Sequence, residues 1–194
     1  RQRQDVYKRQ ADGLYINGKP FGDKLMGVNR HQDYAYIGNA VPNNLHWLDV
    51  KKMRDAGFRI IRSAHYPQDP AFMDACDELG MFIIVATPGW QYWNPEPVFE
   101  ERILSDIRNM VRRDRNHPSV LLWEPVLNET AFPESFAQNA YRATHEEYPA
   151  PGCYAAIDDK SKGAMGYDVV YTAPKNEAFY RNAGKSCFTR EYGD

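Results

Sequence analysis

Two glutamates each follow an apolar run that has the composition of a buried strand. Glu129 comes after residues 119–127 and has an amide neighbour, Asn128, while Glu191 comes after residues 186–189. Two carboxyls about 5–5.5 Å apart cleave glycosides with retention: the protonated one assists departure of the leaving group, and the ionised one attacks the anomeric carbon. Our first hypothesis therefore makes Glu129 an acid/base and Glu191 a nucleophile.

A lone glutamate after a strand is more commonly a surface residue, a helix-capping partner or a salt-bridge member, so spacing alone does not decide this assignment. In a shared pocket, apolar surroundings and a second negative charge raise the pKa of a carboxyl, which would keep Glu129 protonated. Arg190 adjoins Glu191. Because alternate strand residues point to opposite faces, we expect the Arg190 side chain to point away from the site.

Other polar and aromatic side chains stand at expected strand ends and suit a polyhydroxylated substrate, which needs many hydrogen bonds and flat rings for stacking. The candidate substrate-binding residues are His31, Arg62, His65, Trp90, Asn128 and Tyr171. The two histidines are equally consistent with ordinary structural hydrogen bonding. Arg62 is also consistent with a pairing to a barrel carboxylate such as Asp33 or Glu129. Trp123, inside its strand, is expected in the core.

Short apolar runs alternate with amphipathic segments along the chain. We expect strands near residues 25–29, 59–62, 81–87, 119–127, 153–157, 168–173 and 186–189. We expect helices at residues 46–56, 69–79, 97–113, 133–147 and 175–183. Asp69-Pro70 combines a capping residue with a proline at the first helical position, and Gly80 follows the same helix. Asn17-Gly18 between apolar runs predicts a β-hairpin.

This alternation predicts the α/β class, because crossovers of that length join parallel strands. No G-x-G-x-x-G motif follows the first strand and no G-x-x-x-x-G-K-[ST] motif occurs, which argues against the nucleotide-binding, doubly wound folds. The expected fold is a (β/α)8 TIM barrel, truncated after strand 7 and preceded by a short β-hairpin. Catalytic residues of such barrels gather at the carboxyl ends of the strands, where the candidates above stand.

The length of 194 residues suits one domain. Residues 1–10 lack apolar periodicity, and we interpret them as a disordered flank or assembly scar, with a partial TIM-barrel catalytic domain at residues 11–194. A formal net charge of −2 offers no basic field for nucleic acid, and no run approaches the length needed to span a membrane. The 3 cysteines have no paired or metal-type spacing and are expected as buried thiols.

Four segments, in order along the chain, resemble glycoside hydrolase family 2, which includes β-galactosidases, β-glucuronidases and β-mannosidases. They are Gly27-Val28-Asn29-Arg30-His31, Arg62-Ser63-Ala64-His65-Tyr66-Pro67, Asn116-His117-Pro118-Ser119-Val120 followed by Asn128-Glu129, and Thr189-Arg190-Glu191-Tyr192-Gly193-Asp194. The resemblance extends from about residue 14 to the end. It implies a retaining exo-acting β-glycosidase, sugar contacts from Arg62 and His65, and a hydrogen bond from Asn128 to the sugar 2-hydroxyl.

Within that family, His31, His65 and the second-strand motif look most similar to the β-galactosidases, so we expect hydrolysis of terminal β-D-galactosides. Two alternatives stay open: β-glucuronidase or β-mannosidase activity, and a truncated carbohydrate-binding fragment without turnover. The resemblance also implies upstream β-sandwich domains in the full-length protein. It indicates neither the oligomeric state nor the compartment.

Metal-dependent galactosidases of the family carry an acidic, histidine-containing loop after strand three that helps to hold Mg²⁺. Here the corresponding stretch is Val85-Ala86-Thr87-Pro88-Gly89-Trp90, without a carboxylate or histidine. A hard cation prefers oxygen ligands, so we expect no magnesium at this position and no cofactor. Tyr171 is only an approximate counterpart of the family's strand-six tyrosine.

Overall fold

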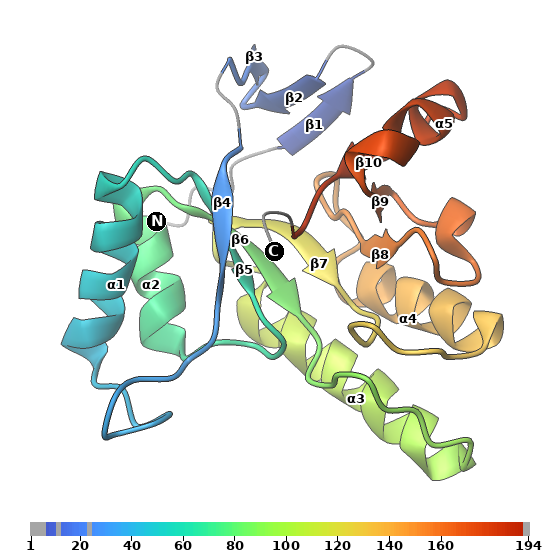
Figure 1. The fold of residues 1–194 in the computed structure, drawn as a ribbon, viewed down its shortest axis with the longest axis horizontal. Helices are drawn as coiled ribbons and strands as arrows, with labels where there is room; N and C mark the ends of the chain where they lie inside the picture. Colours follow the sequence, from blue (N-terminus) through green and yellow to red (C-terminus); the bar gives the residue numbers. More distant parts are fainter. Residues whose placement is uncertain (1–6, 11–12, 23–24, 192–194) are drawn as a thin grey trace.

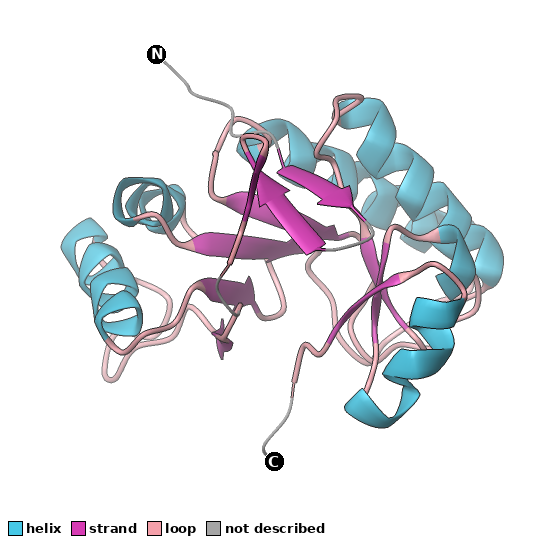
Figure 2. Ribbon diagram, turned by 90° about the horizontal axis from the view of Figure 1, so that it is seen from above, coloured by secondary structure: helices cyan, strands magenta, loops and turns pink. Residues whose placement is uncertain are grey.

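The computed structural model describes residues 7–10, 13–22 and 25–191. Seven parallel strands lie in the middle of the molecule with helices on their outer side (Figures 1 and 2). The first four strands are β4 (Gly27–Arg30), β5 (Ile60–Ser63), β6 (Phe82–Ala86) and β7 (Val120–Glu124). The last three are β8 (Ala156–Asp158), β9 (Val169–Tyr171) and β10 (Ser186–Phe188).

The two groups of strands lie next to each other and are linked by a bridge. Within them the order is β4-β5-β6-β7 and β8-β9-β10, always parallel. A parallel bridge between Trp123 and Ala155, with the Trp123 N–H donating to the Tyr154 carbonyl at 2.9 Å, joins β7 to the chain just before β8. The predicted seven strands of a (β/α) barrel are therefore confirmed, in the predicted order.

The helices follow the predicted segments closely. They are α1 (Asn43–Asp55), α2 (Pro70–Leu79), α3 (Pro97–Asp114), α4 (Glu134–Glu147) and α5 (Glu177–Asn182), with short 3₁₀ turns η1 (Ala164–Gly166) and η2 (Pro174–Asn176). At the start of α2 the Asp69 carboxylate accepts from the Ala71 N–H at 2.8 Å. Gly80 ends that helix in the left-handed region at φ 66°, which a residue without Cβ adopts readily.

The core lies on both sides of the strands. Each residue of β7 is buried, and Trp123 is 1% exposed, as its position in the strand predicts. On the outer side, α3 packs Ile103 and Ile107 toward α4 and the β7–β8 region, in one cluster with Phe136. Burial of both faces explains why these strands read as unbroken apolar runs rather than alternating ones.

A small antiparallel sheet precedes the barrel. Asn17 (φ 51°) and Gly18 (φ 78°) form the predicted tight turn between β2 (Gly13–Ile16) and β3 (Lys19–Pro20). Residues 7–10, which we expected to lie outside the fold, form β1 and pair antiparallel with β2. Strand pairing uses main-chain groups, so a polar segment pairs without an apolar pattern. Residues 1–6 of the expected flank lie outside the described residues.

The side chains of the 3 cysteines are thiols, with Cys76 and Cys153 buried and Cys187 half-buried. Burial raises the pKa of the Cys153 thiol to about 12. No helix in the described part of the chain has the length and apolar character that crossing a membrane requires.

Candidate active site

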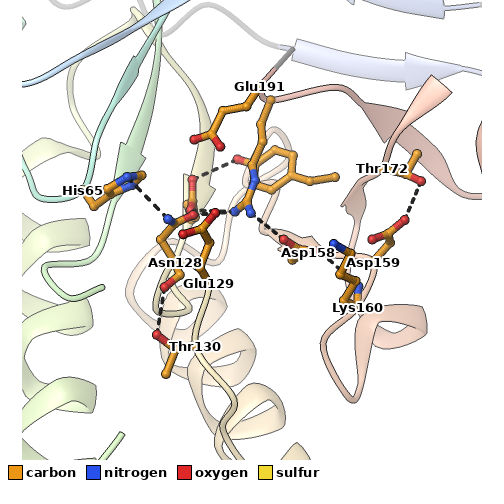
Figure 3. Close-up of polar contacts among 12 residues, drawn as sticks. His65, Asn128, Glu129, Thr130, Asp158, Asp159, Lys160, Thr172 and Glu191 are labelled. Carbon is orange, nitrogen blue, oxygen red and sulfur yellow. Dashed lines mark hydrogen bonds and ion pairs between the residues drawn. The ribbon is translucent and has the colours of Figure 1, made fainter. Parts of the chain in front are cut away.

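The candidate residues converge at the carboxyl ends of the parallel strands. Glu129 lies in the loop after β7, and Glu191 lies three residues beyond the end of β10. From the neighbouring strands, Asn29 of β4 is in register with Arg62 of β5. Figure 3 shows Glu129, Glu191, Asn128 and His65 gathered in one region of the molecule. The fold thus brings together residues separated by up to 162 positions.

Arg62 lies at the centre of the site. Its main partner is a carboxylate that was not among the candidates from the sequence. The Arg62 guanidinium donates to Glu124 twice, from Nε at 2.7 Å and from Nη2 at 2.6 Å. The two side chains are 3% and 1% exposed. Burial on its own lowers the pKa of Arg62, but the charge and hydrogen bonds of Glu124 outweigh it and raise the pKa. Arg62 therefore stays a cation inside the barrel.

The sequence reading considered Asp33 or Glu129 as the partner of Arg62, and the structure corrects this. Besides Glu124, the guanidinium donates from Nη1 to Glu191 at 2.7 Å. Glu124 escaped notice because it stands inside an apolar run and the expected strand, residues 119–127, was longer than β7. A carboxylate within a strand buried on both faces is itself a signal, since such a charge needs a partner.

Glu191 receives two donors at the mouth of the barrel. Arg62 donates at 2.7 Å and the Asn29 amide donates at 3.2 Å, both to Oε1. Its side chain is 29% exposed. The guanidinium of Arg62 therefore holds this carboxylate at the mouth of the barrel. Tyr192, which follows it, lies outside the described residues.

Glu129 has different surroundings. It is exposed, and its Oε2 accepts from the indole N–H of Trp90 at 3.2 Å and from the Gln91 amide at 2.7 Å. The Trp90 bond, followed by the Gln91 bond, lowers the pKa of Glu129. The expectation of a raised pKa is therefore wrong for this arrangement, because donors from the loop after β6 outweigh the small cost of desolvation.

Asn128 is buried between two guanidinium groups. Its Oδ1 accepts from Arg62 at 3.0 Å and from Arg190 at 2.6 Å, and its Nδ2 lies 3.4 Å from the Nε2 of His65. Arg190 also pairs with Asp158 at the end of β8. The expectation that Arg190 points away from the site is wrong. Since β10 ends at Phe188, the alternation of a strand no longer governs the direction of Arg190.

Aromatic rings line one side of the mouth. The His65 ring lies 5.7 Å from that of His31 and 5.8 Å from that of Trp90, centroid to centroid. Trp90 is 56% exposed, in keeping with a surface for stacking. Burial, followed by the charge of Arg62, lowers the pKa of His65, so this imidazole is neutral over most of the physiological range.

Tyr171 lies deeper than the other candidates. It is 2% exposed, and its hydroxyl donates to Glu124 at 3.3 Å. Burial, and then the negative charge of Glu124, raises its pKa well above the ordinary value. The structure thus places Tyr171 in contact with the Arg62–Glu124 pair, with the Arg62 guanidinium 5.9 Å from the centre of its ring. Sequence reading overlooked Gln91 as well, because a neutral amide in a loop carries no chemical signal of its own.

The magnesium expectation stays a prediction. Among the described residues, no three histidine, cysteine, aspartate or glutamate side chains come together in a group able to hold a metal ion. The loop after β6 turns Trp90 and Gln91, rather than charged oxygens, toward Glu129. Undiminished turnover after dialysis against EDTA would agree with the prediction, and recovery of lost activity by Mg²⁺ alone would contradict it.

Comparisons with known proteins place this chain in a family. Residues 8–149 match the family described as "Glycosyl hydrolases family 2, TIM barrel domain". A β-galactosidase of Thermoanaerobacterium thermosulfurigenes is 38% identical over 149 residues, which is 76% of this chain and 20% of that protein. A putative β-glucuronidase of Formosa agariphila is 34% identical over 110 residues, or 57% of this chain and 13% of that protein.

Solved structures show the same fold. An FMN-binding β-glucuronidase from Facaelibacterium prausnitzii L2-6 superposes with a TM-score of 0.81 over 96% of this chain and 32% of its own, at 22% identity. The chain spans about a fifth of the length of the curated relatives it matches first. The match over residues 8–149, together with the converging site at the strand ends, shows that the chain belongs to glycoside hydrolase family 2, as part of its TIM-barrel domain.

Proposed function

We propose that this chain is the barrel segment of a retaining β-glycosidase, in which Glu129 is the acid/base and Glu191 the nucleophile. The observation that carries the proposal is the contrast between the two carboxylates. Glu191 faces the Arg62 cation, whereas Glu129 is exposed and faces two neutral donors. Retaining hydrolysis needs this asymmetry, because one carboxyl must attack as an anion while the other gives up and recovers a proton.

In the first step, Glu191 attacks the anomeric carbon and Glu129 protonates the departing glycosidic oxygen. The bond between the anomeric carbon and that oxygen breaks, and a glycosyl ester on Glu191 forms. In the second step, Glu129 takes a proton from water, the water oxygen attacks the anomeric carbon, and Glu191 leaves as a carboxylate. Two inversions at one carbon retain its configuration.

The contacts of Glu129 support one of its two oxygens as the carrier of the proton. Both Trp90 and Gln91 donate to Oε2, so Oε1 carries the proton in the first step and accepts it in the second. The lowered pKa of Glu129 suits the base step directly. For the acid step, Glu129 must carry a proton before the glycosyl ester on Glu191 forms.

The substrate we propose is a terminal β-D-galactoside, with a β-glucuronide or β-mannoside as the alternative within the family. The 38% identity to a β-galactosidase supports the first, and the 34% identity to a putative β-glucuronidase supports keeping the second. A panel of nitrophenyl β-galactoside, β-glucuronide, β-mannoside and β-glucoside separates them by kcat/KM. The short span of the chain also fits a carbohydrate-binding fragment without turnover.

The test uses the longest natural protein that contains this chain. Glu191→Ala should abolish turnover, and added azide should restore it with formation of an α-glycosyl azide. Glu129→Ala should slow turnover of poor leaving groups, and azide should then form the β-glycosyl azide. Glu101→Ala, an exposed residue of α3, is the matched control and should keep full activity. If neither site variant loses more than about tenfold, roughly 1.4 kcal/mol of barrier, the assignment is wrong.

A further inference from the structure

The side-chain amide of Asn128 has only one possible orientation. Guanidinium groups donate hydrogen bonds and never accept them. Two of them, from Arg62 and Arg190, converge on the same atom of Asn128 at 3.0 and 2.6 Å. That atom must therefore be the carbonyl oxygen, and its two lone pairs are both in use. What Asn128 offers to anything else is its NH2 group, which only donates.

The remaining neighbour of Asn128 fits the same orientation. The Nδ2 atom lies 3.4 Å from the Nε2 of His65. Because the NH2 group of Asn128 can only donate, the Nε2 of His65 is the acceptor in this contact, and burial, followed by the charge of Arg62, lowers the pKa of His65 in favour of the neutral ring that can accept. One N–H of the amide therefore points to His65, which leaves the other for a substrate.

Arg190 is itself held in place. Its side chain is 11% exposed, pairs with Asp158, lies 3.8 Å from the Glu124 carboxylate, and has its guanidinium 5.6 Å from the centre of the Tyr171 ring. Burial raises the pKa of Asp158, while Arg190 acts in the opposite direction. Because Asp158, Asn128 and the Tyr171 ring all contact this guanidinium, the side chain of Arg190 is held in one conformation. Figure 3 shows Asp158 on the far side from His65, with Asn128 between them.

We propose that Arg190 is a positioning residue that locks Asn128 as a hydrogen-bond donor, so that the enzyme selects β-glycosides with a neutral hydroxyl at C2. The inference rests on the proposed function and on Asn128 as the contact of the sugar 2-position. A 2-hydroxyl accepts from the amide. A 2-ammonium group has no lone pair to accept with, and a 2-deoxy sugar leaves the buried amide without a partner.

The experiment compares three substrates in the longest natural protein that contains the chain: the preferred nitrophenyl β-glycoside, its 2-deoxy analogue and its 2-amino-2-deoxy analogue. The wild-type protein should prefer the 2-hydroxy substrate over the 2-amino one by at least a hundredfold in kcat/KM. Arg190→Met removes the shorter of the two guanidinium bonds to the Asn128 oxygen and leaves only that from Arg62. It should therefore lower kcat/KM for the 2-hydroxy substrate at least tenfold and change that of the 2-deoxy substrate less than threefold.

Because Arg190→Met leaves Asp158 without its cation, the charge-matched double variant Arg190→Met/Asp158→Asn is measured beside it. If the single variant does not fold, the double variant decides the question by the same ratio of 2-hydroxy to 2-deoxy rates. Arg190→Lys keeps the positive charge but lacks the forked guanidinium that bridges Asn128 and Asp158. It should therefore lose most of the preference for the 2-hydroxy over the 2-deoxy substrate.

Equal loss on the 2-hydroxy and 2-deoxy substrates would assign Arg190 a purely structural role and overturn the inference. Efficient hydrolysis of the 2-amino substrate by the wild-type protein would overturn it as well. In both cases hydrolysis of the 2-hydroxy substrate leaves the proposed function standing. If the wild-type protein hydrolyses none of the glycosides in the panel, the proposed function fails, and this inference fails with it.

Discussion

At the scale of single residues, Glu129 and Glu191 are chemically identical side chains that their donors make different. Glu191 is bound by a cation and an amide, and Glu129 by an indole and an amide. The strength of each hydrogen bond depends on whether donor or acceptor carries charge. The different roles proposed for the two carboxyls therefore depend on the residues that donate to them, which are Arg62 and Asn29 for Glu191 and Trp90 and Gln91 for Glu129.

The contact between Gln91 and Glu129 makes a prediction about pH dependence. A hydrogen bond to the charged form lowers the pKa of a carboxyl, so its removal in Gln91→Leu raises the pKa of Glu129. The protonated acid then persists to higher pH, and the alkaline limb of the kcat/KM profile moves to higher pH. Trp90→Phe should act in the same direction. Tyr92→Phe, an exposed neighbour in the same loop, serves as control, and an unmoved limb in Gln91→Leu would contradict the prediction.

The buried Arg62–Glu124 pair makes a prediction about stability. Glu124→Gln keeps the shape of the side chain but leaves Arg62 with a neutral partner at its two shortest bonds. Breaking one side of a buried ion pair costs about 3–5 kcal/mol of unfolding free energy. The matched control is Asp55→Asn, in the exposed Lys51–Asp55 pair of α1, which should cost about 0.5 kcal/mol or less. Urea unfolding measures both, and equal costs would refute the account.

At the scale of elements, the close contact of β4 with β5 decides where Asn29 stands. A Cβ added to Gly27 would lie 2.4 Å from the Ile60 carbonyl oxygen and 2.5 Å from its Cγ2. A side chain at residue 27 would therefore push β4 and β5 apart, because Gly27 and Ile60 are paired in the register of the two strands. The absence of a side chain at this position therefore keeps Asn29 at its distance from Glu191.

Gly27→Ala should lower the free energy of unfolding by about 1–3 kcal/mol, the usual cost of forcing extra volume into a packed site. It should also reduce kcat, because the shift of β4 moves Asn29 away from Glu191. Gly22→Ala is the control, since a Cβ there would meet nothing within 4 Å. Thermal melts and turnover are measured on both variants. A Gly27→Ala protein as stable as the control would show that the two strands adjust freely.

At the scale of the whole molecule, the strands form an incomplete ring within the described residues. The sheet order begins at β4 and ends at β10, and these two strands are not paired with each other. Figure 2 shows the strands between two sets of helices. The outer edges of a sheet present unpaired main-chain groups that recruit other chains, whereas a closed barrel has no edges.

Residues 1–194 alone should therefore melt at a lower temperature than a longer protein that contains them, and should associate as their concentration rises. Light scattering and sedimentation across a concentration series measure the association, with the longer protein as control. A monomer with a cooperative melt at high concentration would contradict the prediction. The reason for the expected behaviour is the pair of edges at β4 and β10.

Local sequence patterns were sufficient for the elements of this protein and for the positions of its two glutamates. The apolar runs predicted seven strands, Asp69-Pro70 and Gly80 predicted the bounds of α2, and Asn17-Gly18 predicted the hairpin turn. These features depend on neighbours along the chain, whose backbone geometry a short stretch of sequence specifies. Glu129 and Glu191 follow from the same patterns, since each comes shortly after the end of a strand.

Only the tertiary structure decided which groups face each other. The partner of Arg62 is Glu124, 62 residues away, and Gln91 reaches Glu129 across 38 residues. Arg190 points into the site because β10 has already ended. Such pairings depend on strand register and on loop conformations that no local pattern encodes. The pKa of Glu129 is lowered for the same reason: donors that the fold brings from another loop, not residues adjacent in sequence, set its electrostatic surroundings.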